Sequence, residues 1–381
     1  MEKVNLDNKT ILVTGGAGFI GSNLIKRLIA DTKGTTIVNI DNMNSYYDVS
    51  LKEYRLKELE RVVPAGIKYF FVKGDIAVKA LIDKLFAEYQ FDVVVNLAAQ
   101  AGVRYSIENP DAYIMSNMMG FYNILEACRH SRDAVNGQKS KDEGQPQTSD
   151  LRPQTYAGVE HLVYASSSSV YGGNKKVPFS TDDRVDNPVS LYAATKKSNE
   201  LFAHCYSKLY DIPTTGLRFF TVYGPAGRPD MAYFGFTNKL LKGETIKIFN
   251  YGNCRRDFTY VDDIVEGIVR VMQGAPERKK GEDGLPIPPY AIYNIGGGQP
   301  ENLLDFVNIL QEELVRAGVL PSDFDFEAHK ELVPMQPGDV PTTYADATAL
   351  ERDFGFTPKI TLREGLRKFA EWYKEYNNSL G

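Results

Sequence analysis

Hydrophobic and polar positions follow two patterns through the first half of the chain. Short apolar runs, which are typical of buried strands, occur at residues 10–14, 36–40, 68–73, 93–97, 162–165 and 214–219. Longer stretches with helical spacing lie between them, for example at 19–30, 78–89 and 112–130. Strands that alternate with helices indicate βαβ units and a parallel sheet. Six such strands predict a doubly wound α/β fold.

The alternation ends after Phe220, where a turn rich in glycine and proline (GPAGRP, 224–229) opens a mixed segment that finishes in an amphipathic helix at 362–376. We therefore expect a Rossmann-like domain with a doubly wound parallel sheet and a smaller mixed α/β domain that covers the substrate. The boundaries we expect are 1–223 with 259–275 for the larger domain, and 224–258 with 276–381 for the smaller one.

One segment interrupts the pattern of the first half. Residues 132–158 are polar, contain glycine and proline, and show no apolar periodicity. Such a composition is typical of a surface insertion or a disordered loop, so we expect an insertion here rather than a functional element.

Composition excludes several classes of protein. The chain has 381 residues, of which 43% are hydrophobic and 24% charged, as in an ordinary globular protein. Three cysteines and four histidines without metal-like spacing argue against a disulfide framework and against a metal site. A net charge of −5 gives no basic field for nucleic acid, and no stretch approaches the roughly 20 apolar residues of a membrane span. We expect a reduced, cytoplasmic protein with neither a nucleic-acid nor a membrane partner.

A glycine-rich turn follows the first strand and opens a helix, in the sequence TGGAGFIG at 14–21. Gly15 permits the tight turn, and Gly18 lets the main chain approach a pyrophosphate. The N–H groups at the start of the helix, at Phe19 and Ile20, can then bind the phosphates. Such turns also occur for structural reasons alone, but this context indicates a dinucleotide site.

Two carboxylates follow the next strands. Asp41 ends the second strand, where it can bind both hydroxyl groups of an adenosine ribose and would repel a 2′-phosphate, which selects NAD over NADP. Asp75, with Ile76 beside it, follows the third strand and can reach the adenine. A strand-end turn is the alternative for both carboxylates.

A tyrosine and a lysine lie four residues apart, Tyr192 and Lys196, at the start of a helical stretch. A run of serines, which includes Ser167, Ser168 and Ser169, lies at the end of the preceding strand. Because open α/β sheets bind ligands at the carboxyl ends of their strands, we expect both groups to face one site.

Six motifs, taken together, resemble those of the extended short-chain dehydrogenase/reductase family of nucleotide-sugar enzymes. They are TGGAGFIG, NLAAQAGVR (96–104), ASSSSVYG, YxxxK, RFFTVYGP (218–225) and RRDFTYVDD (255–263). Within that family the chain most resembles UDP-glucuronate 4-epimerases, through GPAGRPDMAYFGFT (224–237) and PMQPGDVPTTYADA (334–347). The resemblance implies bound NAD, with Leu97, Ala98 and Ala99 along the cofactor, and a homodimer formed by helices at 112–130 and 190–210.

The resemblance also implies the chemistry. NAD takes a hydride from C4 of the sugar, the 4-keto intermediate rotates, and the hydride returns to the opposite face. Tyr192 is the expected base, Ser167 the hydroxyl on the same oxygen, and Lys196 the cation beside them. We expect Lys196 and the positive nicotinamide ring to lower the pKa of Tyr192 by about three units from its usual value of about 10.

The substrate end follows from the same resemblance. Related 4,6-dehydratases carry an Asp-Glu pair where this chain has Ser168 and Ser169, and related uronate decarboxylases carry a glutamate at the position of Ser169. Because this chain has no carboxylate at either position, epimerisation is the expected reaction rather than dehydration or decarboxylation. Arg228, with Thr221 and the serine hydroxyls, is the expected clamp for a sugar carboxylate. The remaining residues expected to bind substrate are Asn117 and Phe220 at the sugar or its main-chain cradle, Arg256 at the diphosphate, and Asp339 at the uridine ribose. A packing or capping role is the alternative for Asn117 and Phe220.

Two alternatives stay open at this point. A UDP-glucose or UDP-N-acetylglucosamine 4-epimerase needs the same catalytic residues but no carboxylate clamp, and Thr343 leaves room for larger substituents. A non-catalytic NAD-binding sensor would keep the fold, although such proteins often lose the tyrosine or the lysine.

Overall fold

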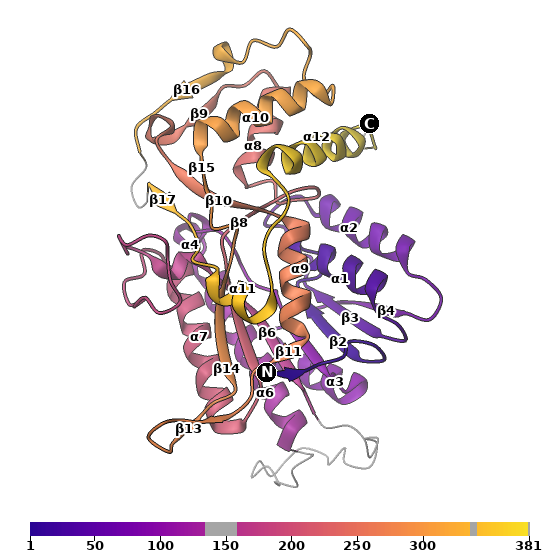
Figure 1. Ribbon diagram of the computed structural model, residues 1–381. Coiled ribbons are helices and arrows are strands. Elements are labelled where there is room, and N and C mark those ends of the chain that lie inside the picture. The colour runs from indigo at the N-terminus through magenta and orange to yellow at the C-terminus, as the bar shows by residue number, and fades with distance from the viewer. Residues whose placement is uncertain (134–157, 336–340, 380–381) are drawn as a thin grey trace.

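The structure, a computed structural model, describes residues 1–133, 158–335 and 341–379 (Figure 1). The insertion expected at 132–158 falls almost entirely outside the described residues, as does Asp339.

A seven-stranded parallel sheet forms the centre of the larger part. Its strand order is β14-β7-β6-β5-β2-β3-β4. Successive strands are added on one side of β2 up to β4 and then on its other side from β5 onward, as in a doubly wound fold. The strands are β2 (Thr10–Thr14), β3 (Thr36–Asp41), β4 (Lys68–Lys73), β5 (Val93–Asn96), β6 (His161–Ser167), β7 (Thr214–Phe219) and β14 (Tyr290–Ile295). The predicted α/β fold class is confirmed, and the six expected strands form within two residues of their expected bounds.

The seventh strand, β14, differs from the expectation. It pairs in parallel with β7 along its whole length, from Tyr290 opposite Thr214 to Ile295 opposite Phe219. The sequence assigned these residues to the smaller domain, because the proline-rich stretch before them hides the apolar run YAIYNI. The last strand of the sheet therefore comes from a segment that follows the first elements of the smaller part along the chain.

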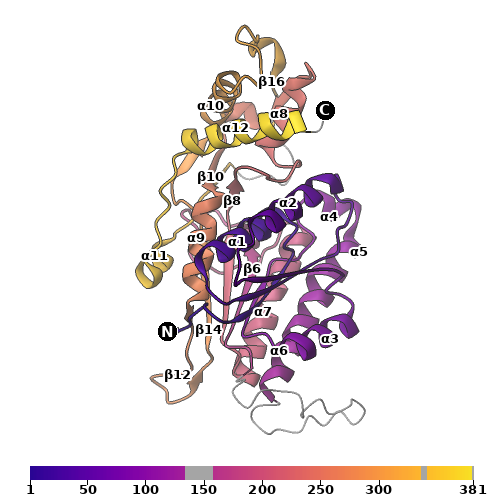
Figure 2. The same cartoon turned by 90° about the vertical axis from the view of Figure 1, so that its right-hand side faces the viewer.

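Helices cover both faces of the sheet (Figure 2). On one face lie α1 (Phe19–Asp31), α2 (Val49–Val62) and α9 (Val261–Met272), and on the other lie α3 (Lys79–Tyr89), α6 (Phe121–Asp133) and α7 (Leu191–Tyr210). Apolar residues of the strands pack against both helical layers in two clusters. The helix expected at 112–130 begins instead as α5 (Pro110–Tyr113) and a π-helical segment (Ile114–Gly120) before α6.

The smaller part lies at the carboxyl ends of the sheet strands, at the top of Figure 1. Here β10 (Arg255–Tyr260) pairs with β8 (Thr221–Tyr223), β15 (Pro300–Asn302) and β17 (Thr342–Thr343), and β9 (Ile246–Ile248) pairs with β16 (Lys330–Leu332). The helices there are α8 (Ala232–Leu241), α10 (Leu303–Arg316) and α12 (Leu362–Ser379). A smaller mixed α/β part is thus present, while the exact domain boundaries stay a prediction.

Short elements complete the described chain. They are β1 (Glu2–Lys3) paired with β11 (Gly274–Ala275), the hairpin of β12 (Lys279–Lys280) and β13 (Pro286–Ile287), and the helices α4 (Tyr105–Glu108) and α11 (Thr348–Phe354). The described residues also form three 3₁₀ helices, at Ser168–Tyr171, Phe249–Gly252 and Glu327–His329. Among the described residues, no helix is long and apolar enough to cross a membrane.

Candidate active site

A cavity of about 490 Å³ opens at the carboxyl ends of the sheet strands, where residues that follow six of the strands converge. Eighteen residues expected from the sequence line it: Gly15, Gly18, Phe19, Ile20, Asp41, Asp75, Ile76, Leu97, Ala98, Ala99, Ser167, Ser168, Ser169, Tyr192, Lys196, Phe220, Thr221 and Arg228. The structure therefore brings the glycine turn, the tyrosine and lysine, the serines and the expected clamp into one site.

The glycine turn has the geometry of a phosphate cradle. Gly15 has a φ of +73°, and a Cβ there would lie 2.7 Å from the main-chain nitrogen of Ala98. A Cβ on Gly18, the residue before α1, would lie 2.9 Å from the main-chain oxygen of Gly15. The first turn of α1 carries no acidic side chain, so its N–H groups present a positive dipole to the cavity. These features fit the pyrophosphate of a dinucleotide.

Asp41 lies at the end of β3 with only 8% of its surface exposed. One carboxylate oxygen accepts a hydrogen bond from the main-chain N–H of Ala17 (3.2 Å) and the other from Met43 (2.9 Å). Nζ of Lys52 lies 3.7 Å from Oδ1, and burial lowers the pKa of this lysine. Asp41 is therefore a fixed carboxylate at the place where an adenosine ribose would lie.

Asp75 is engaged within its own turn. Its carboxylate accepts hydrogen bonds from the main-chain N–H of Ala77 (2.8 Å) and from Nδ2 of Asn42 (2.9 Å). Asp75 still lines the cavity, so a contact to the adenine and a role in the turn are both compatible with its position.

Tyr192 and Lys196 lie on one face of α7, close to its start at the N-cap Ser190. Nζ of Lys196 donates a hydrogen bond to the main-chain oxygen of Ala165 in β6 (2.9 Å), and burial lowers the pKa of this lysine to about 8. Burial raises the pKa of Tyr192, while the nearby hydroxyl of Ser167 and the charge of Arg228 act in the opposite direction. The pKa of Tyr192 is thus raised in the protein alone, and Lys196 is not among the groups that shift it.

The serines turn from β6 into a short 3₁₀ segment. Ser167 accepts a hydrogen bond from the main-chain N–H of Ser169 and donates one to its hydroxyl, both at 3.1 Å. This cap directs the side chains of Ser167 and Ser169 toward each other at the cavity wall. Each serine of 167–169 lines the cavity, and none of the three positions carries a carboxylate.

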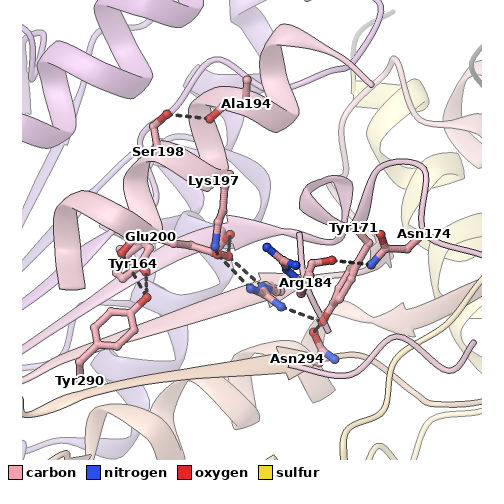
Figure 3. A network of polar contacts seen from close by, with 12 residues as sticks. Tyr164, Tyr171, Asn174, Arg184, Ala194, Lys197, Ser198, Glu200, Tyr290 and Asn294 are labelled. Atoms are coloured by element: carbon pink, nitrogen blue, oxygen red, sulfur yellow. Dashed lines mark hydrogen bonds and ion pairs between the residues drawn. The ribbon is translucent and has the colours of Figure 1, made fainter. Parts of the chain in front are cut away.

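A buried polar network holds this strand from behind (Figure 3). The hydroxyl of Ser166 donates to Glu200 of α7 (2.7 Å), and Glu200 is also paired with Arg218 of β7. Arg218 in turn donates to the hydroxyl of Tyr171 (3.0 Å), which donates to Asn294 of β14 (2.6 Å). The network therefore joins α7 to three strands of the sheet directly below the site.

Arg228 lines the cavity from the loop between β8 and α8. Its Nε and Nη2 donate to the two carboxylate oxygens of Asp230, at 3.0 and 2.6 Å. The guanidinium of Arg228 thus faces the site beside Phe220 and Thr221, and it is already paired with the carboxylate of Asp230.

Two expected substrate residues are absent from the lining of the main cavity, and a third is not described. Asn117 is 1% exposed and outside the cavity lining, where it accepts from the main-chain N–H of Gln100 (2.8 Å) and donates to Thr195 (3.0 Å). Its position therefore fits a support of the cavity wall, and a direct contact to the sugar stays a prediction. Arg256 lines a second cavity of about 210 Å³, which shares Thr221 and Met231 with the first. Asp339 lies outside the described residues.

Several residues that line the main cavity were missed from the sequence. They are Asn42, Asn44, Tyr46, Tyr47, Lys52, Gln100, Ala101, Gly102, Val103, Ser116 and Met231. For Asn42, Asn44, Tyr46 and Tyr47, the polar run DNMNSYYD (41–48) at the end of a strand was the available signal. Among the described residues, no group of three or more His, Cys, Asp or Glu side chains could hold a metal ion.

Comparison with known proteins identifies the family of the chain. The model of the NAD dependent epimerase/dehydratase family matches residues 11–296. The protein CapI of Staphylococcus aureus is 48% identical over 96% of this chain and 98% of its own length. UDP-glucuronate 4-epimerase 4 of Arabidopsis thaliana is 44% identical over 96% of this chain and 76% of its own length.

Solved structures agree with the fold and the cofactor. A UDP-glucuronic acid 4-epimerase from Bacillus cereus, in complex with UDP-glucuronic acid and NAD, is 30% identical with a TM-score of 0.75, and the match covers 96% of this chain and 99% of that one. A UDP-glucose 4-epimerase from Thermotoga maritima, in complex with UDP-glucose, is 26% identical with a TM-score of 0.72, over 97% and 99% of the two chains. The family expected from the motifs and its NAD dependence are thereby confirmed.

Proposed function

The chain belongs to the NAD dependent epimerase/dehydratase family, it is an NAD-dependent epimerase, and we propose that it interconverts UDP-glucuronate and UDP-galacturonate. Bound NAD would accept a hydride from C4 of the sugar and return it to the opposite face. An epimerase has turnover, which excludes the non-catalytic sensor.

The observation that carries the proposal is the combination of side chains around the sugar end of the cavity. Arg228 supplies a cation, and Thr221 and Ser167–Ser169 supply hydroxyl groups without any carboxylate. A guanidinium can bind a sugar carboxylate with two parallel hydrogen bonds. Because neither Ser168 nor Ser169 is a carboxylate, the site lacks the acid and base groups of the related dehydratases and decarboxylases, which favours epimerisation of a uronate that keeps its carboxylate.

The positions of Tyr192, Ser167 and Lys196 in one cavity support proton transfer at C4 as part of the proposal. Tyr192 and Ser167 both line the cavity, and the Ser167 hydroxyl is close enough to lower the pKa of Tyr192, which supports a role for both at one sugar oxygen. In the proposal Tyr192 takes the proton of the 4-hydroxyl as the hydride leaves, and Ser167 holds the same oxygen. Lys196, one turn away, would bind the nicotinamide ribose and supply positive charge.

The nucleotide would extend into the second cavity. Arg256 lies there with Lys247, Phe236 and Phe249, which together offer charge for a diphosphate and aromatic faces for a base. Because Thr221 and Met231 line both cavities, a ligand that leaves the sugar site reaches Arg256 next. Asp339 remains the proposed partner of the uridine ribose from the sequence alone.

A neutral UDP-sugar is the second candidate substrate, and one observation favours it. Asp230 already neutralises the charge of Arg228, so the sugar site does not require an anionic group. The 26% identical UDP-glucose 4-epimerase shows that the fold accommodates such chemistry in a relative.

A panel of UDP-sugars without added NAD tests the proposal. We expect epimerisation of UDP-glucuronate at a higher kcat/KM than of UDP-glucose or UDP-N-acetylglucosamine. Arg228→Ala should reduce turnover of the uronate much more than that of the neutral sugars, and equal losses would exclude Arg228 as the clamp.

We also propose a homodimer. Exposed apolar side chains lie along the π-helical segment, α6 and α7, which pack side by side: Met115, Met119, Tyr122, Leu201 and Leu209. A two-fold pairing of these helices would cover that surface. Sedimentation at micromolar concentration should give twice the mass of the chain, and a monomer would contradict the proposal. The cytoplasmic location stays a prediction from the sequence.

A further inference from the structure

Arg228 and Asp230 lie two residues apart in the loop that leads into α8, and they form a side-on ion pair. Nε and Nη2 of the arginine donate to the two oxygens of the aspartate. Burial alone would raise the pKa of Asp230, but the hydrogen bonds and charge of Arg228 outweigh burial and hold it below the usual value. Asp230 is therefore a carboxylate at neutral pH, and it occupies one edge of the guanidinium.

The other edge of the guanidinium remains for a ligand. Among the residues that the structure describes, none accepts a hydrogen bond from Nη1 of Arg228. Arg228 lines the main cavity, whereas Asp230 is absent from the lining and its side chain is 33% exposed. A guanidinium has five N–H donors in a planar fork, so it can bind a second carboxylate through Nη1 while Asp230 holds Nε.

Tyr46 adds a second hydrogen bond to the carboxylate of Asp230, at the oxygen that also accepts from Nη2 of Arg228. Its hydroxyl donates to Oδ2 of Asp230 (3.3 Å), and its ring lines the cavity. Tyr46 comes from the segment after β3, on the cofactor side of the cavity. Asp230 is thus held by two side chains from different parts of the site, which fixes the orientation of the arginine.

We propose that Asp230 is a positioning residue that holds Arg228 by its Nε edge, so that the Nη1 edge binds the carboxylate of a uronate substrate and keeps it from leaving as CO₂. The inference rests on the proposed function, and it deepens that function by assigning a residue that decides between epimerisation and decarboxylation.

The chemistry explains why orientation matters. After oxidation at C4 the substrate is a β-keto acid. Loss of CO₂ breaks the bond between C5 and the carboxylate carbon, the electron pair moves into the C4 carbonyl to form an enolate, and a proton from water then adds at C5. A carboxylate that is held in one orientation and kept charged loses CO₂ more slowly, and a loose arginine cannot provide that restraint.

The test measures CO₂ released per UDP-glucuronate consumed, in the purified full-length enzyme with bound NAD. We expect Asp230→Ala to raise this ratio about tenfold and to lower the rate of epimerisation about tenfold. Asp230→Asn should show smaller changes in both the ratio and the rate than Asp230→Ala, because the amide oxygen of asparagine can still accept a hydrogen bond from Nε of Arg228. A purely structural loss would lower the rate and leave the ratio unchanged.

Asp186→Ala is the matched control. Asp186 pairs with Arg184 at the same two-residue spacing (3.3 Å), but both side chains are exposed to solvent. The control should behave as the unmodified enzyme in both readouts.

Two results would overturn the proposal while the proposed function stands. One is an Asp230→Ala enzyme with an unchanged ratio of CO₂ to product. The other is a lower KM for UDP-glucuronate in that variant with the same ratio, which would show that Asp230 competes with the substrate for Arg228. Failure of the unmodified enzyme to epimerise UDP-glucuronate would instead contradict the proposed function itself.

Discussion

Glu200 of α7 and Arg218 of β7 form a buried ion pair in which Nε of Arg218 lies 2.8 Å from Oε1 and Nη2 lies 2.9 Å from Oε2 of Glu200. Each side chain is only 3% exposed. Glu200 follows Lys196 by one helical turn, and it also accepts from Ser166, the neighbour of Ser167. The pair therefore fixes the helix with the tyrosine and lysine relative to the strand with the serines (Figure 3).

Removal of the Glu200 charge should destabilise the protein strongly. Glu200→Gln leaves the guanidinium of Arg218 buried without its counter-charge, which costs about 3–5 kcal/mol. Unfolding in urea measures the change. Glu58→Gln is the control, because Glu58 pairs with the exposed Arg61, and such surface pairs contribute about 0–1 kcal/mol. Equal effects of the two substitutions would contradict the structural role of the buried pair.

Lys196 should make the stability of the cofactor-free protein depend on pH. Its folded pKa of about 8 lies below the unfolded value of 10.5, so the unfolded chain binds more protons between these values and stability rises with pH there. Between pH 7.5 and 9.5 this contribution amounts to about 2 kcal/mol. In urea unfolding, the stability of Lys196→Met relative to the unmodified protein should fall by that amount over this range. A constant difference would show that Lys196 titrates normally.

Gly15→Ala should abolish retention of NAD. The added Cβ would meet the main chain of Ala98 at 2.7 Å in the cradle itself. Gly243 is a matched control, because its φ of +69° is nearly the same as that of Gly15 (+73°), while a Cβ there meets no heavy atom of a described residue within 4 Å. The absorbance of bound cofactor after purification measures retention. Normal retention in the Gly15 variant would exclude this turn as the pyrophosphate site.

Asp41→Asn should weaken NAD binding and improve NADP binding. Loss of a charged hydrogen-bond acceptor for the ribose costs roughly tenfold or more in affinity. Lys52, whose Nζ lies 3.7 Å from Asp41, would then be available to a 2′-phosphate. Calorimetry of both dinucleotides measures the change, and a second substitution, Lys52→Met, should remove the gain for NADP. No gain in the single variant would mean that Asp41 does not exclude the phosphate.

The sequence predicted those parts of the site that follow directly from a strand. Gly15, Asp41 and Ser167 each end or follow a regular apolar run, and a parallel sheet brings such ends together whatever the loops do.

The pattern of hydrophobic and polar residues did not predict contacts between residues far apart in the sequence. The strand β14 is placed beside β7 by contacts between residues about 75 positions apart, and a proline-rich stretch hides it locally. Lys52 reaches Asp41 only because α2, which was not assigned from the sequence, folds back over the cavity. The attachment of Asp230 to Arg228, and the absence of Asn117 from the cavity, depend on side-chain directions that no periodicity encodes.

Proton NMR of UDP-glucuronate with the purified protein in D₂O, without added cofactor, tests the central claim most directly. We predict that UDP-galacturonate appears and approaches equilibrium, and that the hydrogen at C4 is retained, because the hydride returns from bound NAD and never exchanges with solvent. Absence of UDP-galacturonate while UDP-glucose is converted, or deuterium at C4 of the product, would contradict the account.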